Sequence, residues 1–168
     1  VMTKYAAVEG TTILAEDFAD RLSSVPAGML DAARSLAGKL SIVAESRIAM
    51  RYGAVAMHDV TEGGVLGASW ELGFANKCAV SIDTAKIPVR EETRALCAAL
   101  SLDPLRLIGS GSLLIACEDG NTLVEALQTQ GIPAAVIGRA IEGSESLVDG
   151  SPLEEPHADE LYRLYSQE

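Results

Sequence analysis

The chain has 168 residues, of which 48% are hydrophobic and 4% aromatic, and its formal net charge is −11. This length suits one domain that buries a core without disulfides or metals. The acidic balance argues against nucleic acid as the main partner, because it repels phosphate backbones. No apolar run reaches the roughly 18 residues that span a membrane, and the first residues lack the pattern of a signal peptide.

The first third of the chain predicts one strand followed by three helices. Gly10 and the two threonines after it form a turn that offers an N-cap to the first helix. Gly53 ends the third helix. The chain opens directly on a strand, so we expect a preceding part to be missing. The strand is expected over 1–7 and the first helix over about 11–20. A second helix is expected to end near residue 36, and a third to cover 41–52.

A short apolar run, Ala54 to Met57, leads into His58 and Asp59. A run of this kind is typical of a strand buried on both faces. An amphipathic helix is expected after Gly63 and Gly64, because apolar or small residues then recur at helical spacing. That inward stripe consists of Val65, Ala68, Ser69, Leu72 and Ala75, and it leaves Trp70 on another face.

The rest of the chain alternates strands and helices. This mixture, without an internal repeat, predicts one α/β domain. Strands are expected over 79–83, 112–117, 134–141 and 147–148, and helices from Pro88 to about Leu100, over 121–130 and over 157–166.

The chain has three cysteines, Cys78, Cys97 and Cys117, which lie far apart and each in an apolar stretch. No C-x-x-C spacing occurs. This predicts reduced, buried thiols in a cytoplasmic protein, with a structural role. No neighbouring base suggests a catalytic thiol.

The segment from Met57 to Leu66 carries the clearest chemical pattern. A buried strand would end, the chain would turn, and a helix would start at Glu62 or Gly63 with Thr61 as its cap. Gly63 and Gly64 would leave the first-turn N–H groups unshielded. A helix start of this kind favours an anion through hydrogen bonds and the macrodipole.

His58 and Asp59 stand at the end of that strand, where ligands bind in many sheet proteins. Asp59 could orient a ribose or amine, or bind magnesium together with a phosphate. His58 could donate to a phosphate or transfer a proton. Alternatively, both side chains only stabilise the turn and the glycines only permit close packing. Spacing by itself leaves the two interpretations about even.

The pattern His58-Asp59-x-Thr61-x-Gly63-Gly64 resembles the signature of a C-terminal domain shared by a superfamily of ATP-dependent enzymes. These are aminoimidazole ribonucleotide (AIR) synthetase, formylglycinamidine ribonucleotide synthetase, selenophosphate synthetase, thiamine-monophosphate kinase and the hydrogenase-maturation dehydratase of the HypE type. The sequence is most similar to the last family. The supporting segments are in the family's order and cover nearly the whole chain: 2–4, 9–15, 87–92 and 102–105.

This resemblance implies an α/β (α+β) domain with three layers, α/β/α, a mixed sheet and a partly ferredoxin-like topology. It implies a preceding domain that dimerises and supplies most ligands for ATP and magnesium. The present domain would close over it, and the enzyme would activate an amide-type oxygen by phosphorylation. The residues implied are His58 and Asp59 for catalysis, and Thr61, Glu62, Gly63 and Gly64 for the nucleotide or phosphate.

A second loop, Gly109-Ser110-Gly111-Ser112, precedes a strand. Gly/Ser loops can bind phosphate with their amides, although a plain tight turn is the commoner interpretation. The resemblance places a substrate-side loop here, so these four residues are a secondary phosphate site. Lys4 and Glu9 flank the first turn, and they form either a surface pair or a contact with the missing domain.

The tail from Leu161 to Glu168 departs from the HypE pattern, because it lacks the terminal cysteine that carries the carbamoyl group in that family. Either the tail was removed, or the chain is a paralogue with another small-molecule or protein-borne substrate. We favour the paralogue, because the last helix reads as complete. The alternatives are another activity of the superfamily, or an interaction module that kept the fold and lost the chemistry. The expected partners are the chain's own N-terminal domain and a second copy of the protein. The sequence contains no cluster of ligands of the kind that binds zinc.

Overall fold

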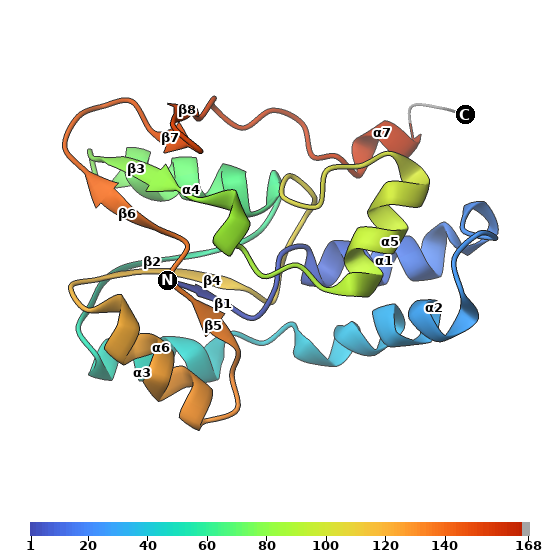
Figure 1. The fold of residues 1–168 in the computed structure, drawn as a ribbon, viewed down its shortest axis with the longest axis horizontal. Helices are drawn as coiled ribbons and strands as arrows, with labels where there is room; N and C mark the ends of the chain where they lie inside the picture. Colours follow the sequence, from blue (N-terminus) through green and yellow to red (C-terminus); the bar gives the residue numbers. More distant parts are fainter. Residues whose placement is uncertain (166–168) are drawn as a thin grey trace.

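The computed structural model describes residues 1–165 and contains two four-stranded sheets flanked by helices (Figure 1). Short 3₁₀ helices, among them η2 at Ser35–Lys39, link some elements. The main elements in chain order are β1 Met2–Thr3, α1 Val8–Asp17, α2 Ala27–Arg34, α3 Val43–Arg51, β2 Ala54–Asp59, α4 Gly64–Ala75, β3 Ala79–Ile82, α5 Glu91–Leu100, β4 Leu113–Cys117, α6 Gly120–Thr129, β5 Ala134–Ala135, β6 Gly138–Ile141, β7 Leu147–Val148, β8 Ser151–Pro152 and α7 Tyr162–Tyr165.

The first sheet has the strand order β2-β4-β1-β5 and is antiparallel throughout. The second sheet has the order β6-β3-β7-β8 and is mixed, because β3 and β7 run parallel. Helices and strands alternate along the chain, and this confirms the predicted α/β class. The predicted strand over 134–141 divides into β5 and β6, which belong to different sheets and so connect them.

The first sheet is the middle one of three layers. On one face, Ile115 of β4 packs with Leu123 and Leu127 of α6. On the other face, Leu114 packs in a cluster that includes Val65 of α4 and residues of the second sheet. Neighbouring residues of β4 thus point to opposite cores, as strand geometry requires.

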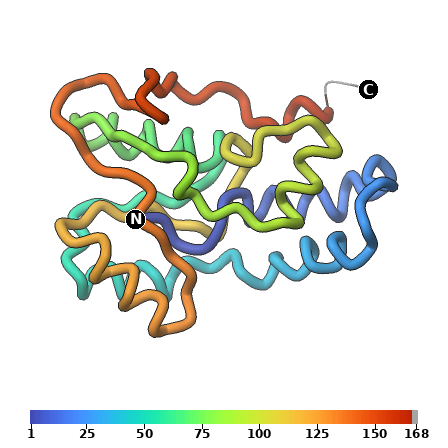
Figure 2. Tube along the Cα trace, viewed as in Figure 1, coloured from blue at the N-terminus to red at the C-terminus, as the bar shows by residue number. Residues whose placement is uncertain are grey.

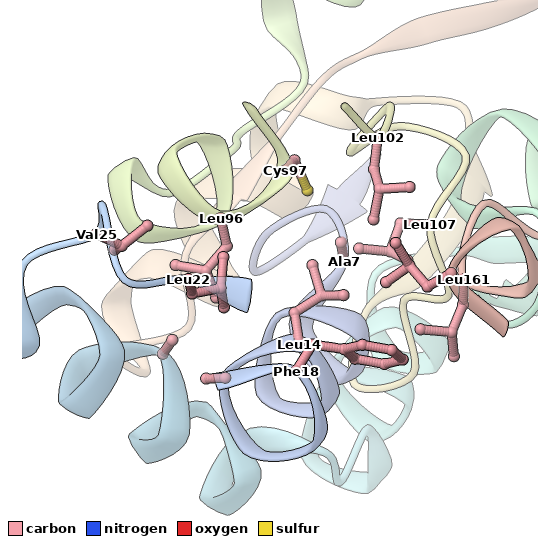
Figure 3. Close-up of a cluster of buried hydrophobic side chains, with 13 residues drawn as sticks. Ala7, Leu14, Phe18, Leu22, Val25, Leu96, Cys97, Leu102, Leu107 and Leu161 are labelled. Atoms are coloured by element: carbon pink, nitrogen blue, oxygen red, sulfur yellow. The ribbon is translucent and has the colours of Figure 1, made fainter. Parts of the chain in front are cut away.

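A separate helical group of α1, α2 and α5 lies beside the sheets (Figure 1). Its core is a cluster that includes Leu14, Phe18 and Leu96, with Leu107 and Leu161 closing one side (Figure 3). The last part of the described chain runs from β8 to α7 along the outside of the molecule, so that it reaches this helical group (Figure 2).

Two predicted boundaries near the start of the chain were wrong. The first strand is limited to Met2–Thr3, because Lys4 adopts a left-handed conformation with φ of 54°. Helix α1 begins at Val8 rather than near residue 11, and Gly10 lies inside it. A glycine is required there, because a Cβ atom would lie 2.7 Å from the carbonyl oxygen of Ile108.

Strand β2 was expected to be buried on both faces, and this was wrong as well. It is an edge strand, and the side chain of Val55 is 81% exposed. Helix α7 is also shorter than the predicted 157–166, and Ser166 lies outside the described residues. Within residues 1–165, no helix is both long and apolar enough to cross a membrane.

The three cysteines are free, but only Cys97 is fully buried. Burial raises the pKa of the Cys97 thiol to about 12, with smaller contributions from the nearby carboxylates of Asp103 and Glu160. Since the thiolate is the nucleophile, we expect iodoacetamide at pH 8 to modify Cys78 and Cys117 while Cys97 stays intact until the protein is unfolded. Peptide mass spectrometry after timed alkylation measures this, and equal rates at the three positions would contradict it.

Candidate functional site

His58 and Asp59 end β2, and they point to opposite faces of the first sheet. His58 lies opposite Leu114 and Asp59 opposite Leu113. The Nδ1 atom of His58 is 2.6 Å from the carbonyl oxygen of Asp59, so it carries a proton and donates it. The Nε2 atom lies 3.4 Å from Oε2 of Glu71 on α4. The Nδ1 atom of His58 also lies 4.0 Å from Oδ1 of Asp59, so the two side chains stay close together although they leave opposite faces of the strand.

The turn after β2 does not use the Thr61 side chain as a helix cap. The N-cap of α4 is Gly63, with a left-handed φ of 78° and no side-chain hydrogen bond of its own. The Thr61 carbonyl oxygen instead accepts hydrogen bonds from the amides of Gly64 (3.1 Å) and Gly109 (3.3 Å). The predicted cap was wrong, because the left-handed Gly63 lies between Thr61 and the helix.

The start of α4 is occupied by a carboxylate of the chain itself. The Gly63 amide donates to Oδ2 of Asp159 at 2.7 Å, and the Leu161 amide donates to Oδ1 of the same residue at 2.9 Å. Asp159 is only 3% exposed. A negative group at a helix N-terminus is favourable, so the expected preference for an anion is met from inside the domain.

Two further contacts close this helix start. A Cβ atom on Gly64 would lie 2.5 Å from the carbonyl oxygen of Leu105, and a Cβ atom on Gly63 would lie 3.3 Å from the Pro156 ring. Glu62 accepts a hydrogen bond from the hydroxyl of Tyr162 at 2.9 Å. The predicted open helix start was therefore wrong: in this conformation segment 156–162 covers it.

Replacing Asp159 with alanine is expected to destabilise the domain by about 1–3 kcal/mol, because the Gly63 and Leu161 amides lose a buried charged acceptor. Urea unfolding followed by circular dichroism measures this. Asp119 caps α6 at the surface through Thr122 and is the matched control, so Asp119→Ala should cost less. An equal loss in both variants would show that Asp159 is only an ordinary cap.

The Gly109–Ser112 loop is firmly anchored but keeps two amides free. The Ser112 hydroxyl donates to the Tyr5 carbonyl at 2.5 Å, and Lys4 Nζ donates to the Gly111 carbonyl at 2.8 Å. Within residues 1–165, the backbone amides of Ser110 and Gly111 have no hydrogen-bond partner. Adjacent free amides in a turn can receive an anion.

Lys4 does not pair with Glu9. Its ammonium group donates to the carbonyl oxygens of Lys39 (2.9 Å), Ser41 (2.7 Å) and Gly111. It also lies 2.5 Å from Oε1 of Glu45, and the two side chains are 12% and 2% exposed. The predicted surface pair was wrong, and Lys4 instead fixes the position of the Gly109–Ser112 loop relative to α3.

Glu9 lies in the first turn of α1, next to that loop. Its neighbour Val8 would contact a Cβ atom on Gly111 at 3.1 Å. The Oε2 atom of Glu9 is buried and has no hydrogen-bond partner within residues 1–165. A buried carboxylate oxygen without a partner is costly. Oε1 of Glu45 also has no hydrogen-bond partner there, but it lies 2.5 Å from the Lys4 ammonium, whereas no ion pair is found for Glu9 within residues 1–165.

No group of three or more His, Cys, Asp or Glu side chains is placed to hold a metal ion in the part of the chain that the structure describes.

Sequence reasoning missed Asp159 and Glu45. Asp159 was assigned to an ordinary helix, although an acidic residue three positions after Pro156 is a common helix-start pattern. Glu45 offered no local signal, because its partner Lys4 lies far away in the sequence.

Residues 1–150 match the family model of the AIR synthase related protein, C-terminal domain. The chain belongs to this family. It is 32% identical over 121 residues to the carbamoyl dehydratase HypE of Escherichia coli (strain K12), an alignment that covers 67% of this chain and 36% of that protein. The chain thus matches well under half the length of this relative.

Solved structures of HypE share the fold of this AIR synthase-related domain. That of E. coli HypE matches with a TM-score of 0.74 and 25% identity, over 97% of this chain and 51% of that one. A HypE in complex with ATP matches with a TM-score of 0.63 and 15% identity, over 93% and 50% of the two chains. At that identity the second likeness shows the fold only.

Proposed function

We propose that this chain is the C-terminal domain of an ATP-dependent enzyme related to HypE. It closes over a preceding ATP-binding domain and helps to activate an amide-type oxygen by phosphorylation. The observation that carries the proposal is the family match over residues 1–150, which names a C-terminal domain. The 32% identity to a carbamoyl dehydratase supports the chemistry.

Within this domain, the Gly109–Ser112 loop is the proposed phosphate contact. Among residues 1–165, its Ser110 and Gly111 amides have no hydrogen-bond partner, whereas the Gly63 amide is already bound by Asp159. Phosphate is held well by backbone N–H groups even on an acidic protein. The segment from Thr61 to Gly64 then has a supporting role, because the Thr61 carbonyl holds the Gly109 amide.

Glu9 and Asp59 are the proposed polar contacts to the partner domain or substrate. Glu9 has a buried oxygen without a partner, and the Asp59 side chain is 60% exposed. Each carboxylate could accept a hydrogen bond or form an ion pair with a donor or cationic group of the other domain. The remaining expected partners, a second copy of the full-length enzyme and a small-molecule or protein-borne substrate, belong to this proposal.

Replacing Ser110 with aspartate in the longer, two-domain protein is expected to raise KM for ATP by about tenfold or more, because a carboxylate would stand beside the phosphate. Steady-state ATP turnover with magnesium measures this. Ser144 is an exposed loop serine in another part of the domain, so Ser144→Asp is the matched control. Equal KM values for the two variants would rule out the loop as the phosphate contact.

The 168-residue chain by itself is expected to show no ATP turnover, because most nucleotide ligands would lie on the preceding domain. Turnover by this chain comparable to that of the longer protein would overturn the two-domain proposal.

A further inference from the structure

Helix α3 presents one of its faces to the outside of the molecule. Together with α6 it covers one side of the first sheet, where Ala49 is fully buried (Figure 1). On the other side of the helix, Val43 is 52% and Met50 69% exposed. Positions 43, 47 and 50 follow one another along one stripe of a helix, so Arg47 stands between the two apolar side chains. We call Val43, Arg47, Met50 and Arg51 the outer face of α3.

The outer face of α3 is cationic, although the chain as a whole has a formal net charge of −11. Glu45 is the only acidic residue between positions 32 and 58, and it is buried. Arg47 and Arg51 are both exposed, and neither forms an ion pair within residues 1–165. The described part of the domain therefore does not neutralise the charge of this face.

Several other surface cations are paired with an acid one helical turn earlier. These pairs are Asp31–Arg34, Asp83–Lys86, Asp103–Arg106 and Glu160–Arg163. Three and four residues before Arg47 the chain has Ala44 and Val43, and before Arg51 it has Ile48 and Arg47. The helix dipole favours Arg51 in the last turn, but two like charges four residues apart weaken a helix. Helix stability therefore does not account for Arg47.

The composition of the outer face fits an interface with another protein. Arg and Met are enriched in such interfaces, and a guanidinium group can hold a carboxylate through two parallel hydrogen bonds. A twofold contact between two α3 helices would bring Arg47 close to its own copy, so like charges would oppose each other. The strongly negative chain disfavours nucleic acid. The face is therefore complementary to an acidic protein surface that also carries apolar side chains.

We propose that the outer face of α3 binds an acidic amphipathic helix of another protein. Its apolar side chains cover Val43 and Met50, and its carboxylates pair with Arg47 and Arg51. A helix fits because the face is a single stripe about two turns long, and the side-chain ridges of one helix pack into the grooves of another. This interaction goes beyond the proposed function and uses neither ATP nor the Gly109–Ser112 loop.

The longer, two-domain protein and a synthetic peptide test this. The probe is a fluorescein-labelled, alanine-based helix that has leucine along one stripe and glutamate on both flanks of that stripe. Fluorescence anisotropy measures its binding. We expect Arg47→Glu to weaken binding by about tenfold or more, because a carboxylate then faces the glutamates. Arg94 is exposed on α5, so Arg94→Glu makes the same change of charge elsewhere and should leave the affinity within about twofold.

Two further variants separate a specific contact from general attraction of charge. Met50→Gln removes the apolar part of the face at an exposed position and should weaken binding several-fold. A peptide with lysine in place of glutamate should bind Arg47→Glu more tightly than it binds the parent protein. Equal losses in Arg47→Glu and Arg94→Glu, or an unchanged affinity in Met50→Gln, would contradict the proposal. Circular dichroism checks that each variant is folded.

The other possible occupants give results of their own. If single-stranded DNA or vesicles of phosphatidylserine bind through Arg47 more tightly than the peptide does, the partner is not an acidic helix. If the longer protein does not bind the peptide, the proposal fails. Binding by the 168-residue chain alone, with the same dependence on Arg47, would then identify the preceding domain as the occupant. ATP turnover by Arg47→Glu should equal that of the parent, so this test and the Ser110→Asp test fail independently.

Discussion

Replacing Lys4 with methionine is expected to lower the free energy of unfolding by about 3–5 kcal/mol, because the Glu45 carboxylate would remain buried without its partner. The Lys4 ammonium also binds three backbone carbonyl oxygens, one of them on Gly111. Its removal leaves those oxygens with fewer donors. Urea or guanidinium unfolding followed by circular dichroism measures the loss.

The pair Lys86–Asp83 provides the control. Its atoms are 3.0 Å apart, but its side chains are 62% and 44% exposed. Since exposed ion pairs contribute about 0–1 kcal/mol, Lys86→Met should cost at most that amount. Adding Glu45→Gln to Lys4→Met should recover part of the stability, because the unpaired charge is removed. If the two single losses simply add in the double variant, Lys4 and Glu45 do not act as a buried pair.

The strand–turn–helix around His58 could be predicted because each of its signals is local. An apolar run precedes the motif, two glycines form the turn, and small and apolar residues follow at helical spacing. The structure has β2 and α4 at those positions. The resemblance, which depends on the order of short segments, identified the family in the same way.

Which groups of the site already have a partner depends on contacts between distant parts of the chain, and these contacts could not be predicted. The Gly63 amide meets Asp159, which lies 96 residues later. Lys4 forms an ion pair with Glu45 and a hydrogen bond to the Gly111 carbonyl, and these three residues belong to three separate segments of the chain. A single sequence shows that a helix start favours an anion, but it does not show whether the chain itself supplies that anion.

The edge position of β2 is a further example. An apolar run is compatible with a fully buried strand and with an edge strand, and only the pairing β2-β4-β1-β5 distinguishes them. Because β2 is at the edge, His58 and Asp59 have only one neighbouring strand. Exposed and half-buried residues alternate along β2, and Asp59 lies on the exposed face, where its side chain is 60% exposed and available to a partner.

These contacts change the role that the sequence suggested for Gly63 and Gly64. Gly63 and Gly64 were expected to expose amides to a ligand, yet both residues are buried. Gly64 lets the backbone of segment 105–107 approach α4, and the Leu66 amide donates to the Leu105 carbonyl at 3.1 Å. Gly63 and Gly64 thus hold the first sheet, α4 and the loop region together. Within residues 1–165, the backbone amides of the Gly109–Ser112 loop without a hydrogen-bond partner lie at Ser110, which is half-buried, and at Gly111, which is buried like the two glycines.

Replacing Gly64 with alanine is accordingly expected to destabilise the domain by about 2–5 kcal/mol, the sum of a strained left-handed residue and an overpacked contact. The φ angle is +63°, and the new Cβ atom would lie 2.5 Å from the Leu105 carbonyl oxygen and 2.8 Å from that of Leu107. Both are backbone atoms, so no side-chain rotation can relieve the contact. Guanidinium unfolding of the variant and the parent chain measures the difference.

Gly131 separates the two contributions. Its φ is +75°, but a Cβ atom there would meet nothing within 4 Å. Gly131→Ala therefore carries only the conformational cost, about 1–2 kcal/mol. The excess loss in Gly64→Ala measures the close approach of segment 105–107 to α4. If the two variants lose equal stability, segment 105–107 can move away from α4 at no cost. The start of α4 would then be open enough to bind an external anion in place of the Asp159 carboxylate.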